Sequence, residues 1–289
     1  MANDFPELNN LNTIDHNRNS AGLHYVYPVV SRRARGVSVG INLNTNNACN
    51  WRCIYCQVPD LKPGTAPPVD LALLEHELRD FLHGLLHGGF MQRRVPEGMR
   101  RINDLAISGN GEPTSAVEFA QVIELIDKLK QNMALPADIK LILITNGSLI
   151  YRENVRQGLR RMAQLNGEVW FKLDRASEDG MALVNGTHIS LGKVRENLAT
   201  AISLCPTWLQ TCWFTMDNAA PDRAEEDAYL DFLAGLLRDG IEPQGVLLYG
   251  LARPSLQPEA PRLAALTEQQ MEAFAARIRA LGIEAKVSP

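Results

Sequence analysis

The stretch Cys49-Asn-Trp-Arg-Cys53-Ile-Tyr-Cys56 places three cysteines on one short segment, with three and then two residues between them. Thiolates are soft ligands that suit iron, and one stretch of backbone can present all three to a cubane iron-sulfur cluster. Because a cubane contains four irons, three ligands leave one iron open to a small molecule. The spacing therefore predicts a 4Fe-4S cluster held by these three cysteines.

Zinc and disulfide bonds are the alternatives for these cysteines. A zinc site usually takes four ligands arranged as two close pairs, but the next cysteine after Cys56 is Cys205 and the next histidine is His76. A disulfide framework is typical of small secreted chains. This chain has 289 residues and five cysteines, and it opens on a polar, acidic segment rather than a signal peptide. Cluster binding is therefore the favoured interpretation.

The composition is typical of a globular protein. At 32.0 kDa and with 45% hydrophobic residues, the chain can bury a sizeable core. No apolar run approaches the roughly 18 residues that suggest a membrane-spanning helix, and free cysteines without an export signal favour a reducing cytoplasm. The formal net charge of −4 argues against non-specific binding to nucleic acid.

The first 22 residues differ from the rest of the chain. Residues 1–22 carry six asparagines and little apolar periodicity, which predicts a flexible N-terminal leader. From residue 23 to residue 289 no short repeat, low-complexity tract or linker interrupts the pattern, so we expect one domain over residues 23–289.

Apolar, β-branched runs alternate with amphipathic helical patterns along this domain. The runs that predict strands are 37–43, 102–107, 139–145, 169–173, 208–215 and 246–251. Among the helices between and after them, Asp70 is a plausible N-cap, and Thr267 with Gln270 forms a capping box. Because strand and helix alternate, the strands should pair in parallel. Six units predict an α/β fold, an open partial (β/α)6 barrel.

The polar motifs lie where such a fold places its chemistry. Reactive residues of parallel β/α folds gather on loops after the carboxyl ends of the strands. The segments 49–56, 109–114, 145–148 and 249–253 follow the first, second, third and sixth predicted strands, and Lys172 with Asp174 end the fourth. We therefore expect these segments to meet at one mouth of the barrel. Arg253, beside this mouth, suits a carboxylate or phosphate of a substrate.

The cysteine loop, followed one β/α unit later by Gly111-Glu-Pro, resembles the radical S-adenosylmethionine superfamily, whose members share a partial β/α barrel. The resemblance covers most of residues 25–289. Within it, a set of segments is similar to iron-sulfur oxidoreductases related to the wyosine-forming enzyme of tRNA modification. These segments are Tyr27-Pro-Val-Val-Ser-Arg-Arg33, Cys56-Gln57, Gly111-Glu-Pro-Thr114, Thr145-Asn-Gly147, Lys172-Leu-Asp174 and Arg253-Pro254.

The resemblance implies roles for individual residues. The three cysteines would hold the 4Fe-4S cluster, and S-adenosylmethionine would be the second cofactor. Tyr55 would lie against the adenine, and Gly111 with Glu112 would bind the methionine amino group. Asn146 and Asp174 would reach the methionine or ribose end. Two further residues complete the predicted cofactor-binding set, Lys172 and Arg253.

The sequence departs from the wyosine-forming enzyme at two points. That enzyme holds a second cluster on cysteines upstream of the triplet, and a lysine upstream forms a Schiff base with pyruvate. This chain has no cysteine before Cys49 and no lysine before Lys62, so wyosine chemistry by that route is not expected. Cys205 and Cys212 supply only two ligands, and Cys212 lies in an apolar strand, so no second cluster is predicted.

Two functions of different classes remain. In the first, the reduced cluster cleaves S-adenosylmethionine to a 5'-deoxyadenosyl radical, which removes hydrogen from a tRNA base, a small metabolite or a peptide. A reducing partner such as flavodoxin or ferredoxin would then supply electrons. In the second, the protein is a non-catalytic iron-sulfur electron carrier or redox-binding module. The convergence of several candidate S-adenosylmethionine ligands favours the enzyme, because a carrier needs no such pocket.

Overall fold

The computed structural model describes residues 21–31 and 36–289, so residues 1–20 of the predicted leader lie outside the described residues. Its strands are β1 (Val26–Ser31), β2 (Gly36–Ile41), β3 (Ala48–Cys49), β4 (Lys62–Pro63), β5 (Ile102–Ile107), β6 (Lys140–Thr145), β7 (Gly167–Lys172), β8 (Thr207–Cys212), β9 (Phe214–Met216), β10 (Gly245–Tyr249), β11 (Leu263–Ala265) and β12 (Ala285–Ser288). Its α-helices are α1 (Leu71–Leu86), α2 (Phe90–Arg94), α3 (Phe119–Asn132), α4 (Glu153–Ala163), α5 (Glu178–Asn185), α6 (Leu191–Leu204), α7 (Arg223–Arg238) and α8 (Glu268–Arg279).

Within the described residues, eight strands form one curved sheet in the order β1-β2-β5-β6-β7-β8-β10-β12. Strand β1 runs antiparallel to β2, whereas the neighbours from β2 to β12 are parallel. The six predicted strands correspond to β2, β5, β6, β7, β8 and β10. The predicted α/β fold with an open, partial parallel barrel is therefore confirmed, and β1 and β12 extend it at its two edges.

The predicted strand over residues 208–215 is wrong at its end. Strand β8 stops at Cys212, and the backbone N–H of Trp213 donates to the carbonyl of Tyr249, 2.9 Å away. The chain then leaves the large sheet, because Phe214 to Met216 pair with β11 as the separate strand β9. Phe214, just after β8, packs against Tyr55 of the cysteine loop, with ring centres 5.6 Å apart.

The helices begin where the sequence predicts them. Asp70 accepts the backbone N–H of Leu73 at 3.0 Å and caps α1. Thr267 and Gln270 form the predicted capping box, in which Gln270 Oε1 accepts the Thr267 N–H at 3.0 Å and Thr267 Oγ1 accepts the Gln270 N–H at 3.2 Å. Such caps satisfy backbone donors that have no partner inside the helix.

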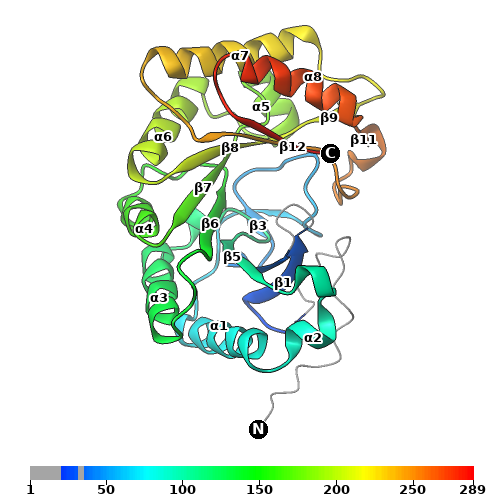
Figure 1. The fold of residues 1–289 in the computed structure, drawn as a ribbon. Helices are drawn as coiled ribbons and strands as arrows, with labels where there is room; N and C mark the ends of the chain where they lie inside the picture. Colours follow the sequence, from blue (N-terminus) through cyan, green and yellow to red (C-terminus); the bar gives the residue numbers. More distant parts are fainter. Residues whose placement is uncertain (1–20, 32–35) are drawn as a thin grey trace.

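The two faces of the sheet have different environments because side chains alternate along each strand. One set lies in the core beneath the helices and includes Leu105, Leu141, Val169, Leu209 and Val246. Figure 1 shows α1, α3, α4 and α6 following one another around this outer side. The alternate set lines a cavity of about 1630 Å³ inside the barrel. Among the described residues, no helix is long and apolar enough to cross a membrane.

Candidate active site

The cysteine loop begins at the end of β3 and is held from three directions. Cys49 pairs with Pro63 of β4. The backbone N–H groups of Arg52 and Ile54 donate to carbonyls at the carboxyl end of α5, at 3.0 and 2.9 Å. The Ser255 hydroxyl donates to the Ile54 carbonyl at 2.8 Å, and the Gln257 amide donates to Val58 O at 3.0 Å. The loop therefore has a fixed path although it contains almost no regular secondary structure.

The thiols of Cys49, Cys53 and Cys56 are partly buried and line one end of the cavity. Burial raises the pKa of Cys49 to about 11 and that of Cys53 to about 12, because a thiolate is poorly solvated there. In the described part of the chain, no three His, Cys, Asp or Glu side chains are close enough to share a single metal ion. A cubane requires wider spacing, since each thiolate binds a different iron. Three thiols on one loop beside an open cavity fit such a cluster as a donor set.

The loop after β5 packs directly against the segment that leads to Cys49. A Cβ on Gly109 would lie 2.1 Å from Asn42 Oδ1, and one on Gly111 would lie 2.0 Å from the Ala48 carbonyl oxygen. These distances are far below van der Waals contact, so a side chain cannot be accommodated. The two glycines thus permit the close approach of two loops of this chain, and both also line the cavity.

Glu112 joins the loops after β5 and β6. The residue is 2% exposed. Oε1 accepts the Thr114 N–H at 3.0 Å and the Thr145 hydroxyl at 2.6 Å, and Oε2 accepts the Asn146 N–H at 2.7 Å. Burial raises the pKa of Glu112, while these hydrogen bonds oppose the rise. The carboxylate is thus held by donors of its own chain at the edge of the cavity.

Asn146 connects the loop after β6 to the cysteine loop. Its Nδ2 donates to Asn50 Oδ1 at 2.8 Å, and its Oδ1 accepts the Ser148 hydroxyl at 2.7 Å. The Asn50 amide in turn donates to the Ser148 hydroxyl at 2.8 Å. Asn146 lines the cavity. Three motifs that are far apart in the sequence therefore form one connected rim.

Tyr55 and Asp174 are joined by a hydrogen bond of 2.5 Å from the Tyr55 hydroxyl to Asp174 Oδ2. Asp174 also accepts the Asn185 amide at 2.6 Å and the backbone N–H of Cys212 at 2.7 Å. It is 1% exposed and does not line the cavity, whereas Tyr55 does. Asp174 therefore faces its own protein and orients the Tyr55 ring.

Asn185 is a residue of this site that the sequence motifs do not include. Besides its bond to Asp174, its Nδ2 lies 3.3 Å from the sulfur of Cys53. Its Oδ1 is buried without a hydrogen-bond partner in the described residues. Because Asn185 ends α5, 132 positions after Cys53, only the folded chain brings the two together.

Lys172 extends into the cavity from the end of β7. Its ammonium donates to the Tyr249 hydroxyl at 3.0 Å and lies 5.0 Å from the centre of the Tyr55 ring. Burial alone lowers the pKa of Lys172, but the neighbouring Tyr249, Asp174 and Cys53 outweigh it and raise the pKa well above the usual value. Lys172 is therefore a cation that faces the cavity.

The predicted site residues lie around one cavity, with Asp174 directly behind it. Arg253 lines the same cavity on the loop after β10, and its carbonyl accepts the Gln57 amide at 3.3 Å. The other two cysteines are buried in the fold. Cys205 lies before the first residue of β8 and Cys212 is its last residue, so they occupy opposite ends of that strand.

Sequence relatives match part of the chain. A UPF0026 protein of Helicobacter pylori (strain ATCC 700392 / 26695) is 31% identical over 135 residues, which cover 46% of this chain and 38% of the relative. A UPF0026 protein of Methanocaldococcus jannaschii is 30% identical over 175 residues, covering 59% of this chain and 47% of the relative. The chain thus spans less than half the length of either relative. No protein-family profile matches the chain.

A solved structure matches nearly the whole chain. The crystal structure of a radical SAM methyltransferase from Sphaerobacter thermophilus superposes with a TM-score of 0.62 and 14% identity, over 91% of this chain and 68% of that one. At this identity the likeness shows the fold alone. The chain therefore shares the fold of that structure, while its sequence relatives are described as UPF0026 proteins, a description that does not mention wyosine.

Proposed function

We propose that this protein is a radical S-adenosylmethionine enzyme in which Cys49, Cys53 and Cys56 hold a 4Fe-4S cluster. The observation that carries this proposal is the position of the three thiols, which lie on one fixed loop at the end of a barrel cavity. When bound, the reduced cluster and S-adenosylmethionine together supply a 5'-deoxyadenosyl radical that removes hydrogen from a substrate. The protein's part is to bind, orient and shield the reactants.

The rim residues suit the two ends of S-adenosylmethionine. The Tyr55 ring, oriented by Asp174, provides a flat surface for the adenine. Gly111 and Glu112 are proposed to bind the methionine amino group, since a buried carboxylate attracts an ammonium. Asn146 is proposed to bind at the same methionine end of the cofactor. Asp174 is proposed to act indirectly, by accepting hydrogen bonds that orient Tyr55 and Asn185. The Asn185 amide in turn lies beside the Cys53 sulfur.

Lys172 and Arg253 provide positive charge on the cavity side of the rim. Both suit a carboxylate or phosphate, belonging either to S-adenosylmethionine or to the substrate. The low-potential electron would come from a flavodoxin or a ferredoxin, and a reducing cytoplasm would be the compartment. A relationship to wyosine-forming enzymes remains part of this proposal.

The alternative is an iron-sulfur electron carrier. It would need the cysteine loop, but not the large cavity that the thiols face. Because the loop after β5 with Gly109 and Gly111 (the glycine loop), Asn146 and Tyr55 surround that same cavity, the geometry favours catalysis.

The test is the formation of 5'-deoxyadenosine by anaerobically reconstituted, dithionite-reduced protein given S-adenosylmethionine. Wild type is compared with Cys53→Ala and with Cys205→Ala, which removes a buried thiol outside the proposed site. We expect product from wild type and Cys205→Ala, and none from Cys53→Ala. A protein that binds iron and sulfide but forms no product under any condition would instead support the electron carrier. Total cellular RNA, added in parallel, tests for a nucleic-acid substrate.

A further inference from the structure

The barrel cavity is larger than one cofactor requires. Its lining extends from the cysteine loop to Asp104 and Lys140, near the beginning of β5 and β6. Ligand pockets usually measure roughly 300–1,000 Å³, and this cavity measures about 1630 Å³. If S-adenosylmethionine occupies the rim, the interior has room for a second ligand of ordinary size. The side chains there should then reveal its chemistry.

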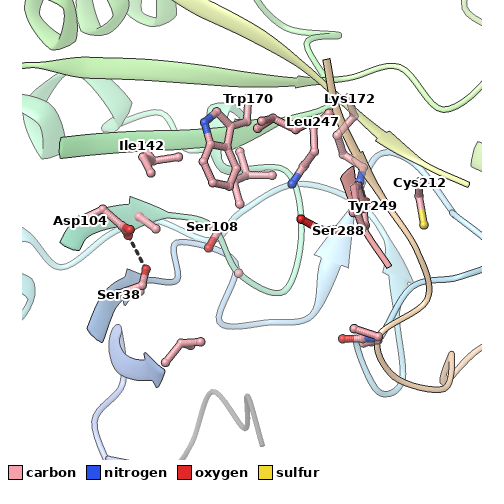
Figure 2. Close-up of a pocket in the computed structure, with 18 of the residues that line it drawn as sticks. Ser38, Asp104, Ser108, Ile142, Trp170, Lys172, Cys212, Leu247, Tyr249 and Ser288 are labelled. Atoms are coloured by element: carbon pink, nitrogen blue, oxygen red, sulfur yellow. Dashed lines mark hydrogen bonds between the residues drawn. The ribbon is translucent and has the colours of Figure 1, made fainter. Parts of the chain in front are cut away.

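Asp104 is a buried acid at the end of the cavity remote from the cysteines. The residue is 7% exposed, and the Ser38 hydroxyl donates to its carboxylate. Figure 2 shows this pair at one side of the cavity, with Lys172 and Tyr249 at the other. In the described residues no lysine or arginine forms an ion pair with Asp104. Lys140 is nearby, but its ammonium pairs with Glu168.

Between these two ends the wall is mostly apolar and aromatic. Ile142, Trp170 and Leu247 point into the cavity from β6, β7 and β10 (Figure 2). Polar groups interrupt this wall, and one of them is buried without a hydrogen-bond partner in the described part of the chain. Gln210 on β8 is 7% exposed, and its Oε1 has no hydrogen-bond partner within the described residues. A buried amide oxygen without a partner is costly, and a ligand in the cavity would provide one.

An acid in this position does not help the fold. Burial raises the pKa of Asp104 to about 6, so the carboxylate is ionised near neutral pH at a cost in stability. Strained or poorly satisfied polar groups of this kind tend to occur where a protein binds or reacts. The ligand group that offsets this cost is a hydrogen-bond donor with a positive charge.

We propose that the substrate is a small molecule carrying a protonated amine, which Asp104 and Ser38 bind at the far end of the barrel. Its apolar or aromatic body lies along Ile142, Trp170 and Leu247, and its other end reaches the rim. This inference deepens the proposed function and rests on it for the chemistry. A small molecule is favoured over RNA because the acid is buried among strand residues, with no net positive charge on the chain to attract a polyanion.

The test measures binding of three probes that share a phenyl ring, namely benzylamine, benzyl alcohol and benzoate. Ligand-observed NMR with the cluster-loaded protein at about pH 8 keeps Asp104 ionised and benzylamine protonated. We expect benzylamine to bind wild type roughly tenfold or more tightly than either analogue, because a hydrogen bond to a charged partner contributes about 1.5–3 kcal/mol. In Asp104→Asn this preference should disappear.

Asp138→Asn is the matched control, since Asp138 also lines the cavity but is exposed. It should retain the amine preference. Equal binding of the three probes to wild type, or an amine preference that survives in Asp104→Asn, would overturn the proposal. The proposal would also be overturned if transfer RNA or a lysine-containing peptide displaced benzylamine while small amines did not. Amine-selective binding without cysteine-dependent 5'-deoxyadenosine would refute the proposed function and leave the amine site standing.

Discussion

Asp104 links stability to function at the scale of one residue. Its ordinary pKa is 3.8, and burial raises the pKa to about 6. The negative charge of Glu168 on β7 also raises the pKa, whereas the Ser38 hydroxyl on β2 and Lys140 on β6 lower it. Between pH 3.8 and about pH 6, Asp104 therefore keeps a proton in the folded protein that it has lost in the unfolded chain. Stability should fall as pH rises through this window and stay reduced above it.

We predict that Asp104→Asn raises the free energy of unfolding at about pH 8. The gain is on the order of 3 kcal/mol, since each pKa unit corresponds to about 1.4 kcal/mol. At about pH 4 the two proteins should differ little, because the acid is then protonated in wild type. Urea unfolding of both proteins at several pH values measures this. Asp138→Asn should show no such gain, and a variant less stable than wild type at about pH 8 would contradict the prediction.

Single residues of the site differ in how far the sequence reveals them. The three cysteines and Tyr55 form a local motif, so their juxtaposition follows from their spacing. Asn185, Ser255 and Gln257 contact this loop from segments more than 130 positions away. Their contacts arise from tertiary packing, and no local pattern marks them. Asp104 carries a weaker signal, as a charged residue that follows Asn103 in a strand whose other residues are apolar.

At the scale of elements, the parallel strands are well predicted because each is a buried apolar run between turn residues. The edge strands are harder. Strand β1 contains Pro28, which weakens a strand pattern and is tolerated at an edge. Strand β12 has four residues at the end of the chain. Strand β8 ends where the chain stops pairing with β10, and the following strand β9 pairs with β11 instead. Local sequence does not encode this change of partner.

The loop after β5 leads to a prediction about the cysteine loop. A methyl group on Gly111 would lie 2.0 Å from the Ala48 carbonyl, immediately before Cys49. We expect Gly111→Ala to cost about 1–3 kcal/mol through overpacking and to displace Cys49. Iron bound per chain after reconstitution should fall together with the melting temperature.

Gly192→Ala is the matched control. Gly192 lies in the first turn of α6 with nothing within 4 Å of its added Cβ. There alanine should leave iron binding unchanged and slightly stabilise the protein, because it favours the helix. Normal iron content in Gly111→Ala would mean that the two loops do not need their close approach to hold the cysteines.

At the scale of the whole molecule, the barrel separates two groups of ligands along its interior. The cysteines, the glycine loop and Tyr55 lie at the carboxyl ends of the strands, while Asp104 lies near the beginning of β5. The polar ends are separated by the wall of Ile142, Trp170 and Leu247 (Figure 2). Ligands bound at the two ends need not compete for the same space.

We therefore predict that S-adenosylhomocysteine and benzylamine bind at the same time. S-adenosylhomocysteine resembles the cofactor but lacks the sulfonium charge, so it should occupy the rim without reaction. Saturating it should leave the affinity for benzylamine unchanged or improve it, because closing the rim removes water from the amine end of the cavity. Titration of benzylamine with and without S-adenosylhomocysteine measures this. Competitive displacement would require both molecules to occupy one end of the barrel. The volume of about 1630 Å³ would then hold a single shared site, and Asp104 would need another partner.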